Sequence, residues 1–314
     1  MSTHHLLPGR TGAHATLAPT SEGRKVTAHG GPATPGSHRN PLRLLPWLLV
    51  SATIAVQIAF PFTDGGTLAL TVVSVTLLAS ASIIHLATTH GAGSAASLVV
   101  IAGGGGLVAE AIGVRTGFPF GTYLYTDSLG WKLLDVPVLV PLAWIMMAWP
   151  ALAVTRRLIR AAGLTGARAR AATPLVGAYA LTAWDVFLDP QMVDQGHWAW
   201  RYPTPSLPGV ADIPLTNFAG WLLVSFLMLA VLDRLVAPAS APDQTRPLDD
   251  GVPVTAYLWT YFSSVMAQAV FFGRPTVAVV GGLLMGAIAL PLLMTIVRAP
   301  ASVIAETGRH RAIP

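Results

Sequence analysis

The chain has 314 residues, of which 53% are hydrophobic and 11% are charged, and its mean hydropathy is +0.59. This composition excludes an ordinary soluble globular domain and predicts a polytopic membrane protein. The absence of cysteine excludes disulfides, thiolate metal sites and cysteine nucleophiles. The net charge of +5 does not indicate a nucleic-acid partner, because the basic residues are spread over short segments between apolar runs, where membrane topology explains them better.

The amino-terminal segment differs from the rest of the chain. Residues 1–43 are rich in Gly, Pro, Thr, Ser and His and contain no early apolar run. We expect them to form a disordered cytoplasmic tail. Five histidines, at positions 4, 5, 14, 29 and 38, are irregularly spaced, which favours a solvated tail over a metal site.

Apolar runs long enough to cross a bilayer then follow one another, and the segment 171–188 is the weakest of them. With a cytoplasmic amino terminus, fifteen Lys and Arg residues lie on the inner side and four on the outer side. This bias predicts an all-α bundle of about eight transmembrane helices with both termini in the cytoplasm. The membrane domain is expected at 44–298, followed by a short cytoplasmic tail at 299–314. The eight predicted spans are 44–62, 67–87, 94–114, 135–155, 171–188, 214–236, 253–272 and 275–297.

The most informative feature is a pair of carboxylates, Asp185 and Asp189, in the fifth predicted helix. Acids at membrane depth are costly, so they favour a functional site. Their spacing of four places both on one helical face, and we expect one of the pair to keep its proton at neutral pH and to serve as a general acid. The alternative is a hydrated helix end, with Pro190 terminating the helix. Asp185, one turn deeper, fits that alternative poorly.

Other polar side chains are predicted at the same depth, near the outer ends of several helices. Glu110 stands in a small, apolar segment and needs a partner from another helix. Arg115, about one turn further, would make it a structural tether. Asn217 opens the sixth helix. These residues predict a site within the bundle, although helix packing alone also uses such groups. Close packing is the simpler interpretation of the glycine run 103–106.

The two long outer segments, 115–134 and 189–213, are rich in aromatic residues. An interfacial aromatic belt explains much of this pattern. The alternative is that the rings line a pocket and stabilise a carbocation through cation–π attraction. Phosphate-binding loops, serine nucleophile elbows and histidine boxes are absent from the sequence, so no cofactor and no metal are expected. The candidate substrate-binding residues are Tyr123, Tyr125, Trp184, Trp198, Trp200, Asn217 and Trp221.

The residues also carry a family resemblance, over about 95–235. The pattern comprises Glu110-Ala-Ile-Gly, Gly117-Phe-Pro-Phe-Gly-x-Tyr-x-Tyr125, Trp184-Asp-x-x-x-Asp-Pro190, Trp198-x-Trp200 and Ile213-Pro-x-x-Asn-Phe-x-Gly-Trp221. It resembles the CruF-type carotenoid hydratases. The resemblance implies addition of water, without a cofactor, across the terminal double bond of an acyclic carotenoid end group, such as that of lycopene, γ-carotene or the anhydro precursors of bacterioruberin. Implied partners are the carotenoid, the lipid bilayer and other enzymes of carotenoid synthesis.

For that reaction the chemistry suggests roles for the candidate residues. We expect Asp185 to donate the proton and Asp189 or Glu110 to orient and deprotonate water. Trp184, Trp198 and Tyr125 would flank the cation.

Two alternatives remain open. The spacing of Asp185 and Asp189 is similar to the second acidic motif of UbiA-type membrane prenyltransferases, which bind diphosphate through magnesium, although their first motif has no counterpart here. A carotenoid-binding protein without catalytic activity is the other alternative.

Overall fold

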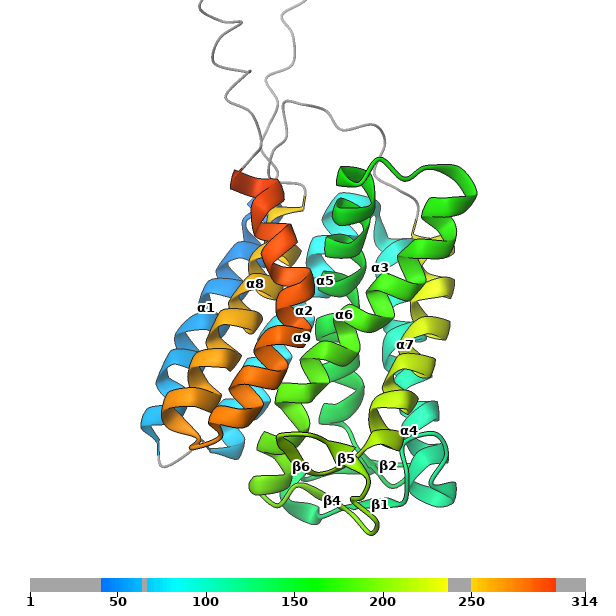
Figure 1. Cartoon of the computed structure of the whole chain (residues 1–314). Coiled ribbons are helices and arrows are strands. Elements are labelled where there is room, and N and C mark those ends of the chain that lie inside the picture. Colours follow the sequence, from blue (N-terminus) through cyan, green and yellow to red (C-terminus); the bar gives the residue numbers. More distant parts are fainter. Residues whose placement is uncertain (1–40, 64–66, 237–249, 298–314) are drawn as a thin grey trace, which may run out of the picture. The chain divides into compact units, whose positions relative to one another are not determined.

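The computed structural model describes residues 41–63, 67–236 and 250–297 (Figure 1). The tails predicted at 1–43 and 299–314 lie outside these residues, apart from a short 3-10 helix, η1 (Pro41–Arg43). The described chain is a bundle of helices, and short strands gather at one end of it. The expected helical membrane bundle is therefore confirmed.

The first half of the bundle contains α1 (Leu45–Ala59) with η2 (Phe60–Phe62), α2 (Leu68–His90), and the continuous run of α3 (Ala92–Leu98), η3 (Val99–Gly104) and α4 (Gly105–Thr116). Thr67 begins α2 by accepting a hydrogen bond from the Leu70 amide. Gly117, at φ 76°, ends α4 in the left-handed conformation that glycine adopts without strain.

The second half contains α5 (Leu139–Ala161), α6 (Gly166–Asp194), α7 (Leu215–Leu235), α8 (Gly251–Met266) with η5 (Ala267–Phe271), and α9 (Pro275–Val297). In the described residues, seven helical segments are long and apolar enough to cross a membrane. The seventh predicted span, 253–272, is not among them; it corresponds to α8 and the π-helix η5 that continues it. It nevertheless packs within the bundle, against α5 and α9.

The centre of the bundle is formed by α5 and α6. In an apolar stretch of 18 residues, 78% of the residues are buried in α5 and 67% in α6, compared with 22% in the stretch formed by α1 and η2. The structure corrects the prediction for the fifth span, because α6 extends well beyond 171–188 at both ends and continues through Pro190. Asp185 and Asp189 therefore lie inside a helix, and the hydrated helix end considered from the sequence is wrong.

The two long connections contain short strands that were not predicted from the sequence. The first holds β1 (Tyr123–Tyr125), the 3-10 helix η4 (Asp127–Leu129), β2 (Lys132–Leu133) and β3 (Val136–Pro137). The second holds β4 (Trp198–Trp200), β5 (Ser206–Leu207) and β6 (Val210–Pro214). β1 pairs antiparallel with β4 and joins the two connections, while β2–β3 and β5–β6 are local hairpins.

Candidate active site in the membrane domain

The aspartate pair on α6 is completely enclosed by the protein. Asp185 is 0% exposed and Asp189 is 2% exposed. The side-chain amide of Asn217, in the first turn of α7, donates to Oδ2 of Asp185 at 2.9 Å and also to Oδ2 of Asp189. Trp198 on β4 donates from Nε1 to Oδ1 of Asp189 at 3.1 Å. One shared donor thus holds the two carboxyl groups next to each other.

Glu110 on α4 forms a second buried acidic centre, and all its side-chain partners are donors. Tyr123 and Tyr125 donate their hydroxyls to Oε2 at 2.5 and 2.9 Å, and Trp144 on α5 donates Nε1 to Oε1 at 3.2 Å. The tether considered from the sequence is wrong, because Arg115 pairs with the exposed Asp135 instead. A carboxyl group surrounded by donors is suited to act as a hydrogen-bond and proton acceptor.

Strand pairing explains how four aromatic residues reach these acids. In the register of β1 and β4, Tyr123 lies opposite Trp200 and Tyr125 lies opposite Trp198. Side chains alternate between the faces of a strand, so these four rings share one face, while Leu124 on the other face is 58% exposed. Burial and the Glu110 charge raise the pKa of the Tyr123 and Tyr125 hydroxyls, so both remain protonated donors.

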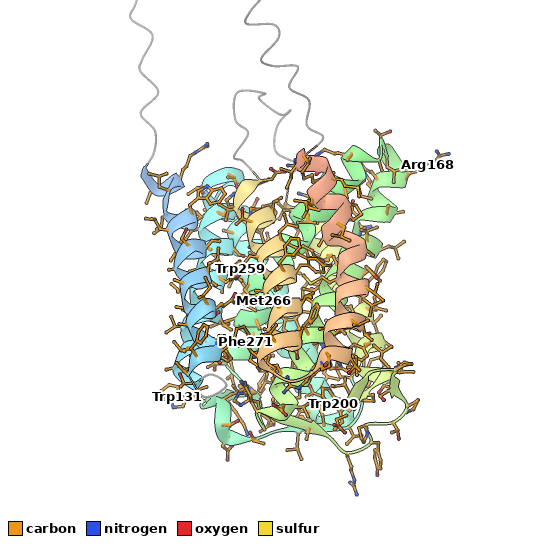
Figure 2. All side chains as sticks on the ribbon, turned by 60° about the vertical axis from the view of Figure 1, so that its left-hand side comes forward. Trp131, Arg168, Trp200, Trp259, Met266 and Phe271 are labelled. Carbon is orange, nitrogen blue, oxygen red and sulfur yellow. The ribbon has the colours of Figure 1, made fainter. Side chains whose placement is uncertain are left out.

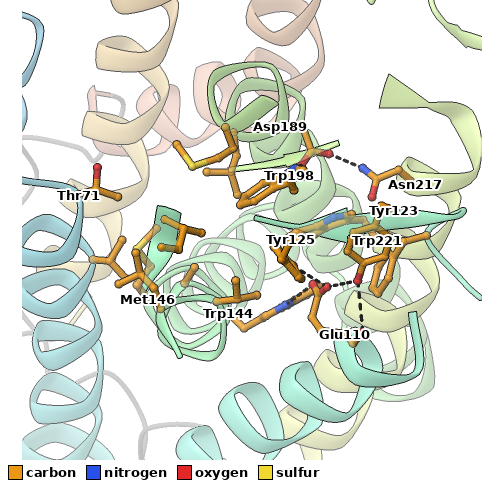
Figure 3. A pocket seen from close by; sticks show the side chains of 18 of the residues that line it. Thr71, Glu110, Tyr123, Tyr125, Trp144, Met146, Asp189, Trp198, Asn217 and Trp221 are labelled. Atoms are coloured by element: carbon orange, nitrogen blue, oxygen red, sulfur yellow. Dashed lines mark hydrogen bonds between the residues drawn. The ribbon is translucent and has the colours of Figure 1, made fainter. Parts of the chain in front are cut away.

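Both acidic centres open into one cavity of about 80 Å³, whose walls are mostly apolar (Figure 3). The structure brings together eight of the ten site residues predicted from the sequence. They are Glu110, Tyr123, Tyr125, Asp189, Trp198, Trp200, Asn217 and Trp221. Asp185 does not line this cavity; it lies one turn behind Asp189 on α6. Trp184 also lies outside the lining and packs edge-on against Trp221, at 6.0 Å between ring centroids.

Trp144 is a site residue that the sequence prediction missed. It is fully buried, and its ring stacks on Trp221 with centroids 4.0 Å apart while its N–H reaches Glu110. A side chain at Gly106 would meet this ring, because an added Cβ would lie 2.6 Å from Trp144. Gly103 faces Ile145 in the same way. Two glycines of the run 103–106 therefore permit close packing of this helix against α5, as the simpler interpretation predicted.

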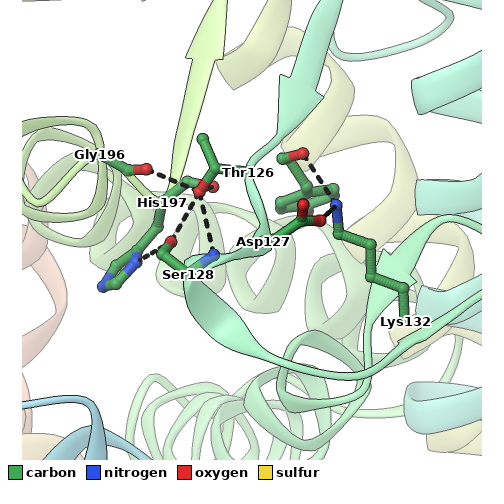
Figure 4. Close-up of polar contacts among 7 residues, drawn as sticks. Thr126, Asp127, Ser128, Lys132, Gly196 and His197 are labelled. Carbon is green, nitrogen blue, oxygen red and sulfur yellow. Dashed lines mark hydrogen bonds and ion pairs between the residues drawn. The ribbon is translucent and has the colours of Figure 1, made fainter.

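A network of hydrogen bonds fastens the two long connections to each other beside the cavity (Figure 4). The Ser128 hydroxyl lies 2.7 Å from Nδ1 of His197, and the Thr126 hydroxyl donates to the Gly196 carbonyl at 2.7 Å. Lys132 donates to Asp127 and to the Tyr125 carbonyl, at 2.7 and 3.1 Å. Burial lowers the pKa of His197, so its ring is neutral at pH 7. These contacts hold β1, and with it Tyr125, against β4.

The arrangement is equipped for acid–base chemistry on an apolar ligand. One wall carries an acid pair that shares a donor, another carries a carboxyl group surrounded by donors, and aromatic faces lie between them. In the described part of the chain, no three His, Cys, Asp or Glu side chains gather in a way that could hold a metal ion.

These features define a membrane-embedded helical protein with an acidic, aromatic cavity near one end of its bundle. The chain belongs to the carotenoid biosynthesis protein family, whose profile matches residues 66–302. The resemblance found in the sequence is thereby confirmed.

Among curated proteins, the chain is similar to a bisanhydrobacterioruberin hydratase from Haloarcula japonica. The two are 34% identical over 127 residues, which cover 40% of this chain and 40% of the relative. The match therefore spans less than half of the relative's length. No solved structure shows a significant match.

Proposed function

We propose that this protein is a carotenoid hydratase. It adds water across the terminal double bond of an acyclic carotenoid end group and forms a tertiary alcohol. The observation that carries this proposal is that Asp189 and Glu110, on different helices, line the same largely apolar cavity. Membership of a carotenoid biosynthesis family and similarity to a protein named as a hydratase support it.

The first step is protonation of the alkene. Asp189 is the member of the aspartate pair that lines the cavity, so we assign it, rather than Asp185, as the acid that contacts the substrate. The proton is delivered to the less substituted carbon of the terminal double bond, and the positive charge develops on the carbon that carries two methyl groups. Asp185 shares the Asn217 amide with Asp189. Two buried carboxyl groups so close together do not readily ionise together, which keeps one proton available to Asp189.

The second step is capture of the cation by water. Glu110 accepts hydrogen bonds from Tyr123, Tyr125 and Trp144, and it takes the proton that the attacking water loses. Return of this proton to Asp189 through water in the cavity restores the starting state. The net change is the addition of one water molecule, with no oxidation or reduction and no cofactor.

The cation needs stabilisation while water approaches. Trp198, Trp221 and Tyr125 line the cavity, and an aromatic face attracts positive charge by about 0.5–2 kcal/mol in protein sites. Trp184, expected from the sequence to flank the cation, acts here through its edge contact with Trp221.

The topology is part of the same proposal. The fifteen to four distribution of Lys and Arg favours cytoplasmic termini, and we propose that the strands and the cavity lie at the outer side of the cell membrane. The proposed partners are the carotenoid, the surrounding lipid and neighbouring enzymes of carotenoid synthesis. Nucleic acid is not among them.

The test is expression in hosts that accumulate lycopene, γ-carotene or an anhydrobacterioruberin-type carotenoid, with chromatography and mass spectrometry of the pigments. A mass gain of one water per acyclic end group is expected. Asp189→Asn should abolish the gain, whereas Asp194→Asn, on the same helix but largely exposed, should retain it.

Other outcomes of this test would refute the proposal. Pigment that stays bound but unchanged in every host, with no effect of Asp189→Asn, would indicate a carotenoid-binding protein. Magnesium-dependent transfer of a prenyl group from a prenyl diphosphate would indicate a prenyltransferase.

A further inference from the structure

A second cavity, of about 290 Å³, lies beside the acidic one. Its walls come mainly from α1, η2, α2, α6, α8 and η5, with Met146 from α5. Five residues line both cavities: Thr71, Val75, Met146, Leu188 and Met192. The two spaces are therefore separated, where they meet, by no more than one layer of side chains.

We propose that the second cavity binds the polyene chain of the carotenoid and that the substrate enters it sideways from the bilayer, between α1 and α8. The identity of the ligand rests on the proposed function. The site and the entry route rest on the cavity itself.

The two cavities differ in volume. Sites that enclose a small molecule usually have volumes of roughly 300–1,000 Å³, and the acidic cavity, at about 80 Å³, is much smaller. It can hold an end group but not the chain attached to it. The second cavity reaches the lower end of that range and is the neighbouring space into which the chain can extend.

Four polar side chains in the wall of the second cavity already have hydrogen-bond partners within the protein, namely Gln57, Ser74, Trp259 and Gln268. Gln57 donates to the Ser74 hydroxyl at 2.9 Å and accepts from Trp259 Nε1 at 2.6 Å, and Gln268 donates to the Phe187 carbonyl at 2.9 Å. Polar groups that are satisfied in this way demand no polar partner from a ligand. Both these satisfied polar groups and the apolar side chains of the wall therefore suit a hydrocarbon ligand.

The open side of this cavity has an apolar rim on the surface of the bundle. Ile58, Phe62, Met266 and Phe271 line the cavity and are also exposed. Figure 2 shows Trp259, Met266 and Phe271 one below another along α8 and η5, on the side next to α1. Phe62 and Phe271 meet edge to face, with centroids 5.5 Å apart. At membrane depth such a rim faces lipid, where a carotenoid is dissolved.

The second cavity is shorter than a carotenoid of forty carbons. The lining of the cavity along α8 and η5 runs from Trp259 to Phe271, a helical rise of ~18 Å. A carotenoid of forty carbons is about as long as the ~30 Å hydrocarbon layer, so part of it must remain in the bilayer. The protein then contacts one end of the substrate at a time and does not select the far end. Both ends of a symmetric carotenoid are processed in separate binding events.

The first test measures binding and is made in an Asp189→Asn background, so that turnover does not affect it. Ile58→Trp and Ser264→Trp fill the cavity, while Val270→Trp adds the same ring at an exposed position of η5 outside the lining. We expect the two filling variants to retain at least fivefold less lycopene after purification and the control to retain the normal amount. Equal retention in all three would overturn the inference, as would a cavity occupied by lipid acyl chains with no pigment.

The second test closes the proposed entrance between α1 and α8. Because the chain has no cysteine, Phe62→Cys and Phe271→Cys can be combined and joined by a short bifunctional methanethiosulfonate reagent. We expect uptake of lycopene from vesicles to fall at least tenfold and to recover on reduction, while each single variant is unaffected by the reagent. Normal uptake by the cross-linked protein would rule out this route.

These outcomes separate the inference from the proposed function. If pigment binding depends on the cavity but no host shows hydrated product, the inference stands and the hydratase proposal fails. If hydration occurs and the filling variants behave like Val270→Trp, the hydratase proposal stands and the inference fails.

Discussion

Replacement of Asn217 by leucine tests most directly whether the two aspartates work as a pair. Leucine has a similar volume and shape but no amide. The change removes the donor that Asp185 and Asp189 share within the described part of the chain and leaves Asp189 with its bond from Trp198. Because Asn217 is 2% exposed, bulk solvent does not compensate for the lost amide. The acids would lose their fixed arrangement while the packing of α7 against α6 is largely kept.

The size of the effect follows from the two bonds. One hydrogen bond to a charged carboxylate and one to a neutral acid are together worth about 2–4 kcal/mol. If that energy positions the acid for protonation, the turnover number should fall roughly 30-fold to 1,000-fold, at about 1.36 kcal/mol for each factor of ten. Asn217→Asp should be worse, because it replaces the donor with a third carboxyl group beside the pair.

The assay is conversion of carotenoid by purified protein in vesicles, with the product measured by chromatography. Thermal unfolding of each variant is measured in parallel. Ser225→Ala is the control, since Ser225 is also buried on α7 and its hydroxyl has no partner in the described part of the chain. If Asn217→Leu keeps turnover within threefold, or if both variants lose it equally, the amide does not organise the acids and the mechanism must be revised.

Three further predictions concern the surroundings of the cavity. Trp144→Phe keeps a ring against Trp221 but removes the bond to Glu110, so the activation free energy of steady-state turnover should rise by about 1.5–3 kcal/mol, whereas unchanged turnover would show that this bond has no part in the mechanism. Gly113→Ala places a Cβ 2.8 Å from the Tyr123 hydroxyl; turnover should fall severalfold, while Gly105→Ala, with open space around it, should match the parent protein in the same assay. Burial lowers the pKa of His197, so unfolding binds a proton and stability should decrease as the pH falls below about 6.5; thermal unfolding of His197→Gln should lack this decrease, and an identical pH dependence would contradict it.

The sequence was enough to predict the acids of the site, because an ionisable side chain in an apolar helix is visible without a structure. It was not enough to rank them. The preference for Asp185 depended on its depth in a helix that was expected to span only 171–188. In the structure α6 continues to Asp194, so depth no longer distinguishes the two acids, and the rotation of α6 brings Asp189 rather than Asp185 to the cavity.

The aromatic residues of the two long connections were also identified from the sequence, but the strands that carry them were not predicted. The alternation in Tyr123-Leu-Tyr125 and Trp198-Ala-Trp200 is a strand pattern, but two strands of three residues become stable only when they pair across 75 residues of chain. Local propensity cannot predict that pairing. Trp144 was missed because it stands in an apolar helix without polar neighbours in the sequence, and its role depends on Glu110 from another helix.

The pairing of β1 with β4 also bears on how one site can serve two reactants of opposite polarity. Water must reach the cation, yet free access of water would ionise the acid pair, and its proton would be lost to the solvent before it could reach the alkene. The sheet carries its aromatic face towards the cavity and an exposed face away from it, and Ser128 and His197 fasten it there. The second cavity approaches from the lipid side. On the proposed function, the carotenoid and the water therefore arrive by different routes, and the order of events is fixed by access: the end group fills the acidic cavity first, and water that is held near Glu110 meets the cation only after it has formed.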